Sequence, residues 1–173
     1  AEQLGFGFLR NWGGGLLTTC GIDHALFMAT DTAEQYHYPP KATEDFGLHG
    51  RISNKPARLV GYGARWDGDQ AILWAEGEVS QASVFGENLV LTRRIEARVG
   101  DAHFTLRDEV ANRGWDPTPH MMLYHINIGF PVVDDGAELL VPTHSATPRG
   151  EFDVEGYRTL EAPEAAHIER VVE

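Results

Sequence analysis

A histidine and an asparagine lie two positions apart in the segment MMLYHINIG, at His125 and Asn127. Residues two apart in an extended strand project to the same side, so both side chains could contact one small polar molecule. A histidine has a pKa near neutrality and can donate or accept a proton at physiological pH. The spacing therefore predicts a polar ligand site with an acid or base in it. The pattern leaves open the alternative that the two side chains satisfy each other or a neighbouring backbone group.

A second histidine lies in the segment LHGR, where His49 and Arg51 flank Gly50. A glycine between them allows the backbone to come close to another group. The segment ends a stretch from 29 to 56 that is rich in Pro, Gly, Thr and Asp, and we expect that stretch to be a long loop. Long loops in compact domains are often functional, although the spacing alone favours a solvated histidine and arginine.

Alternating polar and apolar residues predict the strands that must position these side chains. The alternation runs through residues 57–66, 71–79, 89–99, 104–110 and 121–128. The connections between the first four are short and rich in turn residues, which is typical of an antiparallel meander. In the last segment, Tyr124 falls on the side expected to pack between sheets, and His125 on the side expected to face a groove. We therefore predict an all-β protein.

One charged residue interrupts an apolar face in the segment 89–99. Arg93 shares a side with Leu89, Leu91 and Ile95. An unpaired buried charge is costly, so the arginine needs an acidic partner or a ligand. We predict an ion pair with a neighbouring strand.

The chain has a single cysteine, Cys20, so it forms no intrachain disulfide. This cysteine usage favours a reducing compartment. Its flanking residues, threonine and glycine, include no base. We therefore expect a small buried apolar side chain, with a nucleophilic thiol as the alternative.

Composition restricts the partners of the chain. Its 173 residues include 26 acidic and 14 basic ones, for a formal net charge of −12. Such a surface repels nucleic acid and anionic lipid, so neither is an expected partner. No apolar run reaches membrane-spanning length, and we expect a cytoplasmic protein. The sequence does not set the oligomeric state.

Several segments together resemble a known family. The segments LTTCGIDH, LHGRISNKPA, GEVSQA, RDEVANRG and MMLYHINIGFPVVDDGAELLVP are similar to an uncharacterised aldose-1-epimerase-like branch of the galactose mutarotase superfamily. The resemblance covers nearly the whole chain. It implies an antiparallel β-sandwich of the galactose mutarotase-like supersandwich type, with residues 1–173 as one domain. Beside family members the chain lacks the opening strands and the closing half, so we expect an incomplete sandwich.

The resemblance also implies roles for the site residues. His125 falls on the proposed general acid that protonates the sugar ring oxygen, and His49 on a histidine that orients the substrate. Asn127 lies near the family asparagine, at a spacing of two where many mutarotases have three. Arg51 would bind sugar hydroxyls by analogy of position, because the family arginine lies upstream of the Leu-His-Gly segment. The family's base, a glutamate in a late strand, has no counterpart in this chain.

These roles imply an isomerase that interconverts the anomers of a small sugar by acid–base catalysis, without a cofactor or a metal. Opening a cyclic hemiacetal needs one group that protonates the ring oxygen and another that removes the anomeric proton. The alternative is a β-sandwich that binds sugar without catalysis. A cupin-type metal enzyme ranks last, because it would need His-x-His where this strand offers His-Ile-Asn. The sequence does not name the sugar.

Overall fold

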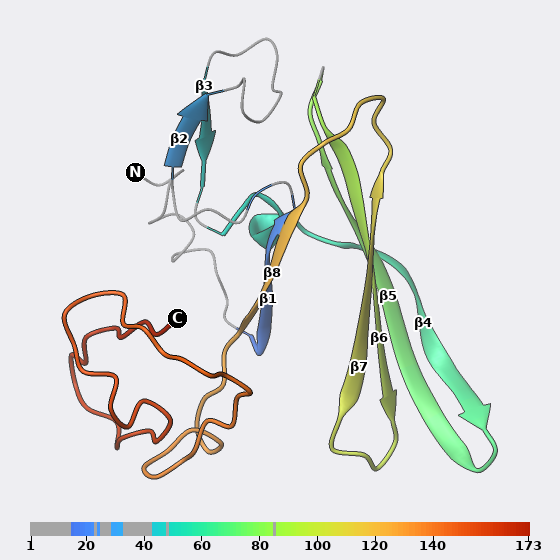
Figure 1. Cartoon of the computed structure of the whole chain (residues 1–173). Coiled ribbons are helices and arrows are strands. Elements are labelled where there is room, and N and C mark those ends of the chain that lie inside the picture. The colour runs from blue at the N-terminus through green and yellow to red at the C-terminus, as the bar shows by residue number, and fades with distance from the viewer. Residues whose placement is uncertain (1–14, 23, 25–28, 33–42, 48, 85) are drawn as a thin grey trace. The chain divides into compact units, whose positions relative to one another are not determined.

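The protein is all-β, with antiparallel sheets that fit the β-sandwich class, as predicted. A computed structural model describes residues 15–22, 24, 29–32, 43–47, 49–84 and 86–173. Its largest sheet has four strands, which Figure 1 shows as a long twisted meander. They are β4 (Arg58–Asp67), β5 (Gln70–Ala82), β6 (Asn88–Arg98) and β7 (Phe104–Asn112). The four predicted strands are confirmed here to within a few residues at each end.

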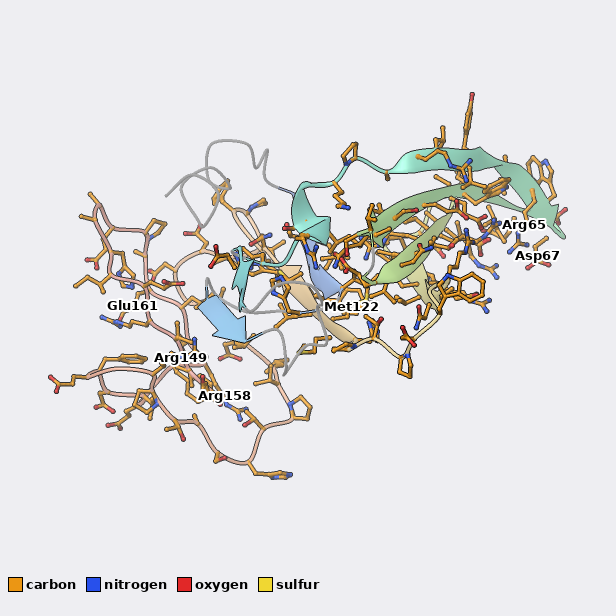
Figure 2. All side chains as sticks on the ribbon, turned by 90° about the horizontal axis from the view of Figure 1, so that it is seen from above. Arg65, Asp67, Met122, Arg149, Arg158 and Glu161 are labelled. Atoms are coloured by element: carbon orange, nitrogen blue, oxygen red, sulfur yellow. The ribbon has the colours of Figure 1, made fainter. Side chains whose placement is uncertain are left out.

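The register of this sheet gives it one apolar and one charged face. Opposed residues in antiparallel strands share a face, so the pairs Val79↔Leu91 and Ala75↔Ile95 lie on the apolar one. The other face carries cross-strand ion pairs such as Arg94 with Glu76. Figure 2 shows Arg65 and Asp67 together near the end of β4, where they extend this charged face.

Two shorter sheets come from the remaining strands. β1 (Leu17–Ile22) pairs antiparallel with β8 (Met121–Ile126), and β2 (Ala29–Thr32) with β3 (Thr43–Phe46). The prediction that 29–56 is a loop throughout is wrong, because it contains β2, β3 and the 3-10 turn η2 (Ile52–Asn54). The sequences of β2, ATDT, and β3, TEDF, do not alternate apolar with polar residues, so they carry no strand signal.

Buried apolar residues from distant segments form the core. They are Ile22 of β1, Ile52 of η2, and Leu89 and Leu91 of β6, with Val79, Val110 and Met122 packed against them. The core therefore holds the apolar face of the four-stranded sheet against β1, β8 and η2. This packing brings the LHGR segment, which immediately precedes η2, close to β1.

The contacts divide the chain into two units, Ala1–Ile126 and Asn127–Glu173. The second unit has little regular structure. Around residues 137–141 the chain forms the isolated bridge Glu138↔Thr159 and no regular strand. Figure 2 labels Arg149, Arg158 and Glu161 in this unit, and Arg149 binds the carboxylate of Glu173. Among the described residues, no helix is long and apolar enough to span a membrane.

Candidate functional site

The two-stranded sheet β1–β8 carries a different polar cluster on each face. Thr18 is opposite His125 in the register, so these two side chains lie on one face, and Cys20 lies two positions along on the same face. Thr19 and Tyr124, also opposite each other, lie on the other face. The predicted division of the strand into a His125 side and a Tyr124 side is therefore observed.

His49 joins the first face from outside the sheet. Its Nδ1 lies 3.2 Å from the Sγ of Cys20 in a buried contact. Its ring meets the ring of His125 edge to face, with centroids 5.2 Å apart and an interplanar angle of 86°. We call His49, His125 and Cys20 the histidine cluster. The structure thus brings together the two histidines that the sequence singled out 76 positions apart.

Close backbone packing fixes the position of His49. The N–H of Gly21 donates to its carbonyl at 3.0 Å, and His49 itself has a positive φ of 63°. The next residue, Gly50, has a φ of +77°, and a Cβ there would lie 2.3 Å from the carbonyl oxygen of Gly21. Only glycine fits both the conformation and the space. The predicted close approach at Gly50 is thus made to the backbone of β1.

Burial sets the electrostatics of this cluster. His49 and Cys20 are buried, at 9% and 1% exposed. Burial, and then the neighbouring charge of His125, lower the pKa of His49 below 6.5. Burial raises the pKa of the Cys20 thiol. At neutral pH the cluster therefore contains a neutral His49 ring and a protonated thiol.

The lowered pKa of His49 predicts that the protein loses stability in acid. The unfolded chain binds a proton at this histidine below about pH 6.5, where the folded protein still resists it. The free energy of unfolding should therefore decrease as the pH falls below that value. Urea unfolding from pH 8 to pH 5 measures this slope, and His49→Gln should make it shallower. An equal slope in the variant would contradict the prediction.

Arg51, the other predicted site residue of the LHGR segment, binds a buried carboxylate. Its Nη2 lies 2.9 Å from Oε1 of Glu87, whose side chain is 0% exposed. The hydroxyl of Ser83 donates to the second oxygen of Glu87. Arg51 therefore anchors the segment that carries His49 to the β5–β6 turn. Its role in sugar binding stays a prediction.

Replacing Arg51 with Met should lower the free energy of unfolding by about 3 kcal/mol, because Glu87 would remain buried without its cationic partner. Urea denaturation measures this loss. A matched control is Arg58→Met, which removes an exposed pair with Glu78 and should cost less than about 1 kcal/mol. Adding Glu87→Gln to Arg51→Met should restore part of the lost stability. If Arg51→Met were as stable as Arg58→Met, the anchoring role of Arg51 would be contradicted.

The opposite face of β1–β8 carries a second cluster, in which Asp108 accepts hydrogen bonds from two other strands. Arg93 binds it through Nε at 2.8 Å and Nη2 at 2.7 Å, and the Tyr124 hydroxyl donates to it at 2.8 Å. Arg93 also donates to the hydroxyl of Thr19. The predicted ion pair between Arg93 and a neighbouring strand is confirmed. We call these four residues the Asp108 network.

Tyr124 in this network is less buried than predicted. It points toward Asp108, as expected for the side facing the large sheet, but 45% of the residue is exposed. Its hydroxyl reaches the edge of the packed region and binds a carboxylate there. Deleting its ring should therefore cost less than deleting a fully buried aromatic.

A cleft of about 410 Å³ lies where β1 and η2 meet the apolar face of β5 and β6. Its volume is in the range of small-molecule sites. Neither His49 nor His125 lines it, and its charged groups already bind protein atoms: Arg93 to Asp108, Lys55 to the carbonyl of Ser80. We therefore place the candidate site at the histidine cluster and not in this cleft.

Two site predictions have mixed outcomes. Asn127 was expected in the same strand as His125, but β8 ends at Ile126 and Asn127 begins the second unit. Its role in ligand binding stays a prediction. Cys20 is buried, as expected, yet a base does lie beside it, because His49 approaches from 29 positions along the chain. Residues adjacent in sequence could not have shown this partner.

The class of protein is thus an all-β protein in which a histidine from outside the sheet contacts a histidine and a thiol on one strand pair. Among the described residues, no group of three or more His, Cys, Asp or Glu side chains could hold a metal ion. The profile of the family described as "Domain of unknown function (DUF4432)" matches residues 1–173, so the chain belongs to this family. No curated protein and no solved structure matches the chain.

Proposed function

We propose that the protein is a carbohydrate-active isomerase of the aldose-1-epimerase type, with His125 as the general acid and His49 as the residue that orients the sugar. One observation carries the proposal. The Nδ1 atom of His125 is buried and has no hydrogen-bond partner among the described residues. Buried polar atoms almost always have a partner, so a bound ligand or water is expected to contact this nitrogen.

The arrangement suits the opening of a cyclic hemiacetal. A protonated His125 would donate its proton to the ring oxygen as the bond from that oxygen to the anomeric carbon breaks. A base takes the proton of the anomeric hydroxyl, which leaves an open-chain aldehyde that can close again from the other face. The proposal assigns no residue to the base. His49 lies in ring contact with His125, where it can hold the same sugar.

The test is anomer exchange by NMR. Saturation transfer between the α and β signals of glucose and galactose should be faster with the protein than in buffer alone. In protein labelled at histidine, both His49 and His125 signals should shift on adding sugar. The exposed His103, which lies beyond β6, serves as the internal control and should not move.

The outcomes separate the candidate functions. Shifts at the histidine cluster without faster exchange would favour a sugar-binding protein that is not a catalyst. No shift at His49 or His125 with any aldose tested would refute the proposal.

A further inference from the structure

The contact between Cys20 and His49 determines which nitrogen of His49 carries a proton. A neutral imidazole has one N–H donor and one bare nitrogen acceptor, and the hydrogen bond at one nitrogen fixes the other. Here Nδ1 lies 3.2 Å from Sγ in a buried environment. The thiol therefore occupies the Nδ1 side of the ring.

Two arrangements are chemically possible at this contact. The thiol can donate to a bare Nδ1, with the ring proton on Nε2, or Nδ1–H can point at the sulfur. A thiol is a weak donor and its sulfur a weak acceptor, whereas a bare imidazole nitrogen is a strong acceptor. The first arrangement also gives the buried S–H a partner, while the second leaves it to find another. The first is therefore the more stable.

We propose that Cys20 is a positioning residue that donates its thiol proton to Nδ1 and so holds His49 in the Nε2–H tautomer. The backbone supports this geometry, because the Gly21 N–H binds the His49 carbonyl and Gly50 packs against Gly21. Cys20 and Gly21 are neighbours in β1, so one short segment holds both the ring and the backbone of His49.

A division of labour between the two histidines follows, and this step rests on the proposed function. With Nδ1 bound to the thiol, the ring proton of His49 lies on Nε2, so this histidine is suited to orienting the sugar and not to transferring a proton. Proton transfer falls to His125, whose Nδ1 is not held by a described residue. The tautomer itself can be tested without any sugar.

Two measurements on the sugar-free protein test the proposal. Because Cys20 is the single cysteine of the chain, its S–H infrared stretch is unambiguous. We expect this band at a lower frequency than in an unfolded sample, and at a higher frequency in His49→Phe than in the wild type. Long-range ¹H–¹⁵N spectra at pH 8 should show the His49 proton on Nε2.

Variants at Cys20 separate positioning from packing. In Cys20→Ala the two ring nitrogen signals of His49 should move toward each other as the tautomers mix, whereas Cys20→Ser, which retains a donor, should keep the wild-type pattern. The signals of His103 are the control for both. A proton found on Nδ1, or a wild-type S–H band at the unfolded frequency, would overturn the proposal even if the variants fail to fold. A protein that passes these tests but never binds sugar would refute only the proposed function.

Discussion

Replacing His125 with Gln is expected to slow anomer interconversion by about 10²- to 10⁴-fold, the usual contribution of one general acid. Glutamine retains a polar side chain of similar reach but cannot transfer a proton. The Michaelis constant should therefore change little while kcat falls. Saturation-transfer NMR or polarimetry measures both quantities.

A matched control for this variant is His103→Gln, which changes an exposed histidine in the turn between β6 and β7 and should leave the rate unaltered. Unfolding curves for both variants check that the fold is intact. A folded His125→Gln protein that retains more than about a tenth of the wild-type rate would remove His125 from the role of general acid.

Replacing Asp108 with Ala is expected to lower the free energy of unfolding by roughly 3–5 kcal/mol, since one partner of a largely buried ion pair is lost. The carboxylate is 4% exposed and accepts three hydrogen bonds, two from Arg93 and one from Tyr124. Without it, the guanidinium of Arg93 would lie between β1 and β7 with only Thr19 as a partner in this network. Urea or thermal unfolding measures the loss.

The control for Asp108 is Asp67→Ala, because Asp67 forms a similar strand-to-strand pair with Arg98 at 3.5 Å but is exposed. That change should cost less than about 1 kcal/mol. The double variant Arg93→Met/Asp108→Leu should recover much of the stability, since apolar residues can replace a buried ion pair. If Asp108→Ala and Asp67→Ala lowered the free energy of unfolding equally, burial of the Asp108 network would not contribute to stability.

Strand alternation predicts one of the contacts of the Asp108 network but not the others. Alternation places Arg93 on an apolar face, and the cost of an unpaired buried charge predicts an acidic partner for it. The same alternation puts Asp108 on the apolar side of the next strand, so the pair could have been named by aligning the two strands. What alternation cannot supply is the contact with Tyr124 and Thr19, because these residues belong to a different sheet.

In the histidine cluster, the sequence predicts the site residues but not all of the contacts between them. Residue type and resemblance indicate His49 and His125 as site residues, and the structure brings their rings into contact. The sequence does not indicate Glu87 as a buried residue, because a carboxylate in a turn gives no local sign of burial. The residues that flank Cys20 do not include the histidine that contacts it, so the sequence predicts only a small buried side chain.

The sequence by itself determined the all-β class, the strands from β4 to β8, and the two faces of most of them, because the alternation of a strand is a local property written in neighbouring residues. The tertiary structure decided which distant segments meet. The contact of Cys20 with His49 depends on Gly50 packing against Gly21, and that of Arg51 with Glu87 depends on where η2 meets the large sheet. Such contacts depend on the path of the loops and on the core that holds the sheets together. Neither produces a periodic pattern of residues in the sequence.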